Sequence, residues 1–268
     1  MAVAGAPGLQ PTVLPDAAAV AERVAELLLA ERLQRPGQPL GLATGRTMEP
    51  VYAALARRCR GLAPAEQQRL RQEWLSFNLD EYVGLAAHDP HAFAAFMATH
   101  LVAPLGLERG RVLLPDGLAA DPAAEARRYA ARLAAAGGLG LQVLGLGLNG
   151  HVGFNEPPCP AEATCRCVDL CASTRTANAS AFGGDAAAVP GRAITLGLAE
   201  ILQARRLLLV VTGVAKGPVL RRLLVEPAHA DLPASWLRLH GAVTLLVDQA
   251  AAASAAASAA ASAGQAGQ

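Results

Sequence analysis

Short apolar segments that alternate with helical patterns constrain the fold of this chain more than any other feature. Five segments have the length and character of buried strands, and periodic apolar patterns typical of helices lie between them. The strand segments are residues 40–42, 74–78, 141–146, 206–212 and 243–247. This alternation predicts an α/β fold in a single domain: a doubly wound, mostly parallel sheet with helices on both faces.

The two ends of the chain differ from its centre. Asp16 precedes a helical pattern with Val20, Val24 and Leu28 along one side, so residues 15–249 are expected to form the folded domain and residues 1–14 a flexible leader. From position 250 to 268 the chain is an alanine and serine repeat with no charge and no large apolar side chain. We expect this tail to be disordered or a frayed helix, because it has nothing to dock with.

Composition excludes several classes of partner. The formal net charge is +1 and charged residues make up 17% of the chain, which gives no reason to expect nucleic acid or an anionic membrane as a partner. The N-terminus lacks a basic region followed by a long apolar segment, so we expect a cytoplasmic protein.

The cysteines do not have the spacing of a metal site. Four of the five lie close together in the sequence, but no C-x-x-C pair is present. We therefore expect reduced thiols and no bound metal. The four are Cys159, Cys165, Cys167 and Cys171.

Polar, glycine-containing segments follow four of the predicted strands. They are residues 44–47, 80–84, 147–156 and 212–216. The carboxyl ends of parallel strands meet at one edge of a sheet, where ligands of such folds bind. A ligand site is therefore predicted at this edge, independently of any family.

Two of these segments suit an anion. Thr44, Gly45, Arg46 and Thr47 form a turn before a predicted helix, where hydroxyls, unpaired N–H groups and a guanidinium can bind phosphate. Lys216 stands at a helix start, where its charge opposes the helix dipole unless an anion is bound. An ordinary capped turn and a solvent-facing lysine are the simpler alternatives.

The other two segments suit proton transfer. Asp80 and Glu81 follow a strand, and strand alternation allows only one of them to face the site, with Asp80 as a candidate general base. The alternative for Asp80 is a turn-forming role. His151 lies in a glycine-rich loop and needs an orienting partner, for which Asn149 and Glu156 are the nearby candidates.

From about residue 40 to 248, the chain resembles the glucosamine-6-phosphate deaminase family. The matching stretches are T-G-R-T, F-N-L-D-E-Y-V-G-L, G-L-G-L-N-G-H-V-G-F-N-E-P, S-T-R-T-A-N and the lysine of T-G-V-A-K. The resemblance implies a Rossmann-like fold. It also implies conversion of glucosamine 6-phosphate and water to fructose 6-phosphate and ammonia, without cofactor or metal.

The resemblance also implies roles for single residues. Asp80 resembles the base that moves a proton between C1 and C2, and His151 resembles the group that opens the pyranose ring. Glu156 and Asn149 are implied to hold and tune the imidazole. The implied phosphate cradle consists of Thr44, Gly45, Thr47 and Lys216.

This sequence departs from the family pattern at several positions. Arg46 stands where the family usually has glycine, and Ser180 stands where many members have a phosphate-binding arginine. We therefore hypothesise that Arg46 replaces the missing guanidinium. The segment 159–168 lacks most of the polar residues that bind an acetylated sugar-phosphate activator, so that mode of activation is not expected.

Other readings remain open from the sequence. A 6-phosphogluconolactonase is disfavoured by Tyr82 and by residues 152–156, where lactonases have a different pattern. A sugar-phosphate sensor is expected to lose the acid–base pair, yet Asp80 and His151 are both present. A deaminase for another hexosamine 6-phosphate, such as galactosamine 6-phosphate, stays open, and so does a homo-oligomer.

Overall fold

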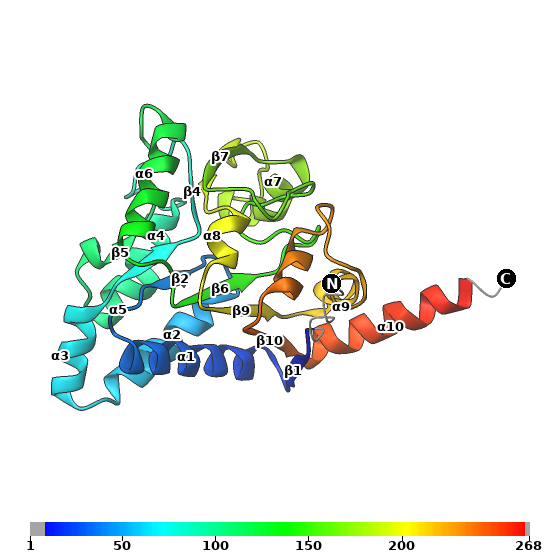
Figure 1. The fold of residues 1–268 in the computed structure, drawn as a ribbon, viewed down its shortest axis with the longest axis horizontal. Coiled ribbons are helices and arrows are strands. Elements are labelled where there is room, and N and C mark those ends of the chain that lie inside the picture. Colours follow the sequence, from blue (N-terminus) through cyan, green and yellow to red (C-terminus); the bar gives the residue numbers. More distant parts are fainter. Residues whose placement is uncertain (1–8, 266–268) are drawn as a thin grey trace, which may run out of the picture.

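A seven-stranded sheet forms the centre of the molecule, and all of its strands are parallel (Figure 1). The computed structural model describes residues 9–265, with side chains as far as Ser258. Across the sheet the strands run in the order β1 (Pro11–Leu14), β10 (Val243–Asp248), β9 (Arg206–Val211), β6 (Leu141–Gly145), β2 (Leu40–Leu42), β3 (Ser76–Asn78) and β5 (Val112–Leu113).

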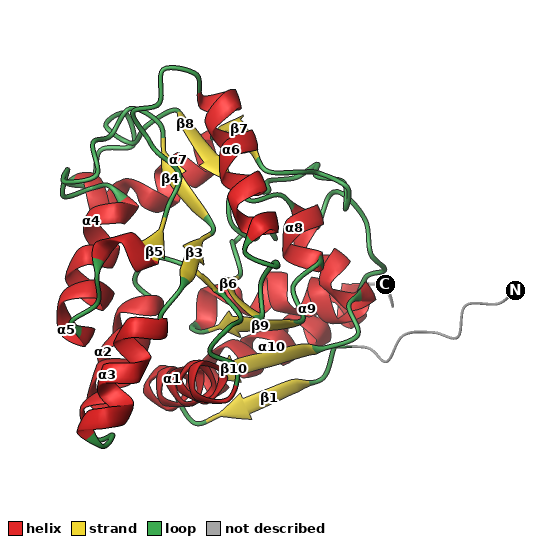
Figure 2. Cartoon of the chain, turned by 60° about the vertical axis from the view of Figure 1, so that its left-hand side comes forward, coloured by secondary structure: helices red, strands yellow, loops and turns green. Residues whose placement is uncertain are grey.

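Helices cover both faces of this sheet, which confirms the predicted doubly wound α/β class. Figure 2 shows α1 (Ala17–Gln34), α2 (Met48–Arg60) and α3 (Pro64–Glu73) on one side. On the other side lie α6 (Pro122–Ala135), α8 (Leu198–Leu202) and α9 (Gly217–Val225). The chain leaves β2 toward β3 but leaves β6 toward β9, so right-handed crossovers place these helices on opposite faces.

The reversal of direction between β2 and β6 makes this pair the topological switch point. In open parallel sheets, the loops at the carboxyl ends of two such strands diverge and leave a crevice. The segment after β2 contains residues 44–47, and the segment after β6 contains His151. The fold therefore opens a crevice between two predicted site loops, one expected to bind an anion and the other to transfer a proton.

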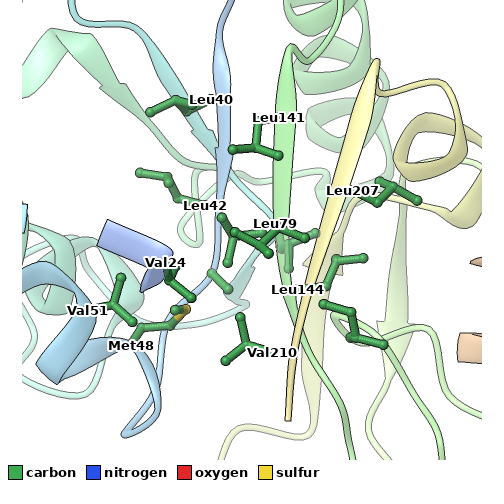
Figure 3. Close-up of a cluster of buried hydrophobic side chains, with 14 of the residues drawn as sticks. Val24, Leu40, Leu42, Met48, Val51, Leu79, Leu141, Leu144, Leu207 and Val210 are labelled. Carbon is green, nitrogen blue, oxygen red and sulfur yellow. The ribbon is translucent and has the colours of Figure 1, made fainter. Parts of the chain in front are cut away.

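The core lies between the sheet and its helices. Figure 3 shows Val24 of α1 and Val51 of α2 close to strand residues Leu42 and Val210. All four side chains are almost fully buried. Burial of each such side chain contributes about 1.5–3 kcal/mol. Because both faces of the sheet are covered, β6 and β9 are nearly continuous apolar runs.

A second, antiparallel sheet was not predicted. It has the order β4 (Asp80–Tyr82), β8 (Arg192–Thr195) and β7 (Arg166–Asp169). The polar segment 157–191, for which the sequence predicted no helix or strand, contains β7 and α7 (Ala172–Asn178). These elements are too short to show a period. They matter because the pairing of Asp80 with Thr195 fixes the backbone of the candidate base.

The remaining short elements connect these layers. They are α4 (Phe93–Met97), the π-helix η1 (Ala98–Val102), α5 (Ala103–Leu105), and the 3-10 helices η2 (Arg109–Arg111), η3 (Ala179–Phe182), η4 (Val214–Lys216) and η5 (Pro233–Leu239). Along the described residues, 9–265, no helix is both long and apolar enough to cross a membrane.

Both predictions for the chain ends need correction. Part of the expected leader is β1, in which Val13 pairs with Val247 of β10; residues 1–8 lie outside the described part. The tail, expected to be disordered or a frayed helix, forms the helix α10 (Gln249–Gln265), and Ala251 and Ala255 are buried, so the expectation that it has nothing to dock with is corrected; residues 266–268 lie outside the described part. Alanine's small side chain lets α10 approach α9 closely, so the helix docks without large apolar residues.

Candidate active site

A cavity of about 570 Å³ opens at the carboxyl edge of the parallel sheet. It brings together the segments that follow β2, β3, β6 and β9, as the strand-end argument predicted. Seven of the nine predicted site residues line it; Asn149 and Glu156 do not. The polar residues and turn glycine at this edge are Thr44, Gly45, Arg46, Thr47, Asp80, His151, Thr212 and Lys216.

The turn after β2 leaves several donors unpaired at one end of the cavity. The Met48 N–H donates to the Gly45 carbonyl at 2.8 Å, which tightens the turn at the start of α2. Thr47 is the N-cap of α2, but its side chain makes no capping hydrogen bond. Its hydroxyl and the N–H of Glu49, for which no hydrogen bond occurs among the described residues, therefore remain available to an anion. Arg46 is exposed and lines the same end.

Lys216 lines the same cavity from η4. Its side chain is half-buried, and loss of solvent lowers the pKa of the ammonium. Within the described residues no carboxylate forms an ion pair with it. A partly buried cation without a partner is costly, and a bound anion offsets that cost. The arrangement suits a phosphate group.

Asp80 lines the cavity but is nearly buried, with 6% of the residue exposed. No hydrogen bond to this carboxylate occurs among the residues that the structure describes. Burial raises the pKa of Asp80 to about 8, and the nearby charge of Glu81 adds to the shift. An isolated carboxylate with a pKa near neutrality is suited to take up and return a proton.

Glu81 points away from the cavity, as the alternation along a strand predicted. Its carboxylate accepts hydrogen bonds from the backbone N–H groups of Tyr82 (2.9 Å), Phe93 (2.9 Å) and Ala94 (2.7 Å). Glu81 thus anchors the start of α4, and of the two adjacent acids only Asp80 is a candidate for chemistry.

Asn149 fixes both the orientation and the tautomer of His151. Its Oδ1 lies 2.7 Å from His151 Nδ1 and 3.2 Å from the backbone nitrogen of His151. Because that backbone N–H can only donate, the atom facing it is the amide oxygen, and Nδ1 carries the proton. In the neutral ring, Nε2 therefore holds the free lone pair.

Burial keeps this imidazole neutral. Loss of solvent lowers the pKa of His151 to about 4, with the charge of Glu156 opposing the shift and that of Lys216 adding to it. The ring also lies directly over Gly147, where an added Cβ would overlap ring atoms. Only glycine at this position lets the imidazole occupy its place.

Glu156 does not hydrogen-bond His151 in the structure. Its carboxylate accepts the Cys171 N–H at 2.9 Å, the Cys171 thiol at 2.8 Å and the Thr174 hydroxyl. Burial acts to raise the pKa of Glu156, but these donors outweigh it and hold the pKa below its usual value. Glu156 therefore acts on His151 through its charge, as the tuning role implied, and no hydrogen bond through which it could hold the ring occurs among the described residues.

The sequence did not reveal an aromatic wall that lines part of the cavity. Its members come from four separate segments, and Asn178 joins it by donating to the Tyr82 hydroxyl at 3.0 Å. Ser180 lies on the same side. The wall consists of Tyr82, His91, Phe93, Phe154 and Phe182. No spacing rule connects residues this far apart.

Known proteins share both the fold and the sequence of this chain. Residues 15–246 match the model of a family described as glucosamine-6-phosphate isomerases/6-phosphogluconolactonase. The chain belongs to this family. That placement agrees with the crevice at the β2–β6 switch point and with the residues that line it.

Within the glucosamine-6-phosphate isomerase/6-phosphogluconolactonase family, the deaminase branch is the more similar. A glucosamine-6-phosphate deaminase of Streptomyces coelicolor is 39% identical over 245 residues, covering 91% of this chain and 92% of the relative. The solved structure of a monomeric glucosamine-6-phosphate deaminase is 34% identical with a TM-score of 0.86, covering 92% of this chain and 100% of its own.

Lactonases of the family share the fold at a greater distance. A 6-phosphogluconolactonase from Trypanosoma cruzi is 18% identical with a TM-score of 0.72, over 92% of this chain and 97% of its own. At that identity the match speaks for the fold alone.

The cysteines sit in different environments. Cys159 and Cys165 are buried, Cys167 is half-buried and Cys171 is exposed, and all are free thiols. Burial raises the pKa of Cys165 to about 12. Within the described part of the chain, no three His, Cys, Asp or Glu side chains are arranged to hold a metal ion.

Proposed function

We propose that this chain is a glucosamine-6-phosphate deaminase that converts glucosamine 6-phosphate and water to fructose 6-phosphate and ammonia. One observation carries the proposal. A neutral, oriented imidazole and an isolated buried carboxylate face one cavity, which is also lined by the Lys216 cation and by the turn at the start of α2. An aldose–ketose conversion needs one acid–base group at the ring oxygen and another at the carbons.

Ring opening falls to His151. Nε2 accepts the proton of the 1-hydroxyl, the bond between C1 and the ring oxygen breaks, and the ring oxygen takes that proton to become the 5-hydroxyl. The hydrogen bond between Nδ1 and Asn149 holds the ring for both transfers. The product is the open-chain 2-amino aldehyde.

Deamination falls to Asp80. The carboxylate removes the C2 proton while the aldehyde oxygen takes a proton from the 2-ammonium group of the substrate, which gives an aminoenol. The resulting carboxylic acid then returns its proton to C1, leaving an iminium at C2. Water adds to C2, and ammonia leaves as the ketone forms. Both proton transfers use side chains of this chain, so the proposal includes no cofactor and no metal. It also places the enzyme in the cytoplasm, where phosphorylated sugars are metabolised.

The pH dependence of kcat/KM tests the role of Asp80. Because the base must be ionised and its pKa is raised to about 8, kcat/KM should rise with pH up to about that value. Glu81→Gln removes the adjacent charge but keeps an oxygen for the N–H groups of α4, so its profile should move to lower pH. The ionisations of the substrate are the same for the wild type and for Glu81→Gln, so they do not contribute to the difference between the two pH profiles. Identical profiles would remove Asp80 as the titrating base.

We further propose that Arg46 binds the 6-phosphate together with Thr44, Gly45, Thr47 and Lys216. Arg46 lines the cavity, and a guanidinium can form two charge-assisted hydrogen bonds to phosphate. The simpler alternative is that Arg46, which is exposed, points to solvent and pairs with Glu49; the described residues contain no such ion pair.

Arg46→Gly should raise the KM for glucosamine 6-phosphate by roughly ten-fold, since a lost phosphate contact of this kind is worth about 1.4 kcal/mol. Steady-state kinetics with phosphorylated and unphosphorylated glucosamine measure the effect, which should be confined to the phosphorylated sugar. Arg60→Gly, at the opposite end of α2, is the matched control. An unchanged KM for Arg46→Gly would end the proposed contact.

A further inference from the structure

Asp248, the last residue of β10, makes an unusual set of backbone contacts. Both of its carboxylate oxygens accept the N–H of Gly213, at 3.0 and 2.9 Å. Oδ1 also accepts the N–H of Ala251 at 2.8 Å, which caps the start of α10. The residue is 4% exposed and does not line the cavity. A buried carboxylate therefore joins the loop after β9 to the alanine-rich helix.

Gly213 is the point at which this contact reaches the cavity. Its φ of +92° turns the chain sharply at the end of β9, a conformation that favours glycine. Its carbonyl accepts the backbone N–H of Lys216 at 3.0 Å. Gly213 is thus held through its N–H by Asp248 and through its carbonyl by Lys216, so the carboxylate and the lysine are linked through one residue.

Helix α10 packs against the backbone that follows Lys216. Gly217 follows Lys216 directly, and a Cβ added there would overlap the side chain and backbone of Ser254. The two backbones approach this closely only because both residues are small. The Lys216 backbone is therefore fixed between Asp248 on one side and Ser254 on the other.

We infer that Asp248 is a positioning residue for Lys216, and that the alanine and serine repeat of α10 serves as the second half of this support. The inference rests on the proposed role of Lys216 in phosphate binding. Lys216 has no ion-pair partner of its own within the described residues, so the direction of its ammonium depends on its backbone. Asp248 acts through Gly213 and not on the substrate.

The test compares Asp248→Ala with Asp248→Asn. Alanine removes every acceptor, whereas asparagine keeps one oxygen for the N–H groups of Gly213 and Ala251. We expect Asp248→Ala to raise both the KM for glucosamine 6-phosphate and the inhibition constant of inorganic phosphate about ten-fold, with kcat at saturation nearly unchanged. Asp248→Asn should recover most of the affinity. A general loss of folding would instead lower kcat and the active fraction together.

A second pair of variants tests the contact from α10. Ser254→Leu should push the helix away from Gly217 and weaken phosphate inhibition. Ala253→Leu adds the same bulk on the exposed side of the same helix and should leave it unchanged. This pair carries the test if Asp248→Ala fails to fold.

Lys216→Ala separates this inference from the function on which it rests. If Lys216→Ala weakens phosphate inhibition and the double variant with Asp248→Ala is no weaker than Lys216→Ala alone, the two residues act on one contact, as inferred. If Lys216→Ala weakens inhibition but Asp248→Ala and Ser254→Leu do not, the positioning role is wrong and phosphate binding by Lys216 stands. If Lys216→Ala has no effect, the phosphate role itself fails, and the inference fails with it.

Discussion

Asp80→Asn is expected to lower turnover by about 10²–10⁴-fold while substrate affinity changes little. Asparagine matches the shape of aspartate but cannot accept the C2 proton. The phosphate end of the cavity, which supplies binding energy, is untouched. Measured kcat and KM for glucosamine 6-phosphate give both quantities, and turnover near that of the wild type would remove Asp80 from the mechanism.

The same variant should be more stable than the wild type at alkaline pH. The folded-state pKa of Asp80 is raised to about 8, so stability associated with this group is present at low pH and is lost as pH rises through that value. Asparagine avoids burying an unpaired charge. For a domain of this size, each kcal/mol regained raises Tm by roughly 2–4 °C.

Thermal melts at pH 5 and pH 9 measure this effect. The advantage of Asp80→Asn should be larger at pH 9, where the wild-type carboxylate is ionised. Asp169→Asn, on the exposed edge of the same small sheet, is the control and should show no comparable gain. A variant that melts below the wild type at pH 9 would contradict the isolation of this carboxylate.

Gly147→Ala should lower turnover at least 100-fold by displacing the His151 imidazole. An added Cβ would overlap the ring, so the imidazole must leave its place over the loop and lose its hydrogen bond to Asn149. A displaced ring that reaches solvent should titrate near the ordinary histidine pKa of about 6.5 rather than about 4. NMR titration of the ring protons measures the shift directly.

Gly145→Ala is the matched control for this experiment. Gly145 lies two residues earlier, at the end of β6, and a Cβ there meets no atom within 4 Å. Gly145 lines the cavity, so this control is read at the imidazole, whose pKa should stay near 4. Turnover near that of the wild type in Gly147→Ala would show that the position of the ring over Gly147 does not matter for the reaction.

The parallel sheet could be predicted because its strands carry a strong signal. Residues 206–211 are almost continuously apolar, since both faces of the strand are covered, and turn residues mark its end. The site could be predicted for the same reason: parallel strands bring their carboxyl ends to one edge, so Thr44, Asp80, His151 and Lys216 meet there.

The rest of the structure depends on contacts that leave no local pattern. The strands β4 and β7 have three and four residues, too few for a period to be visible. The partners of Glu156 come from α7, a helix of seven residues that the sequence did not mark. The docking of helix α10 was not predicted, because a periodic pattern of large apolar side chains is the usual sign of a docked helix. This helix instead packs closely through small alanine and serine side chains.

Ammonia release from glucosamine 6-phosphate tests the proposed function most directly. The purified protein is assayed with glucosamine, galactosamine and mannosamine 6-phosphates, and 6-phosphogluconolactone hydrolysis is measured beside them. The site predicts equal amounts of ammonia and fructose 6-phosphate from glucosamine 6-phosphate, a strong loss of this activity in Asp80→Asn, and no lactonase activity. Lactone hydrolysis without release of ammonia from any hexosamine 6-phosphate would contradict the proposed function.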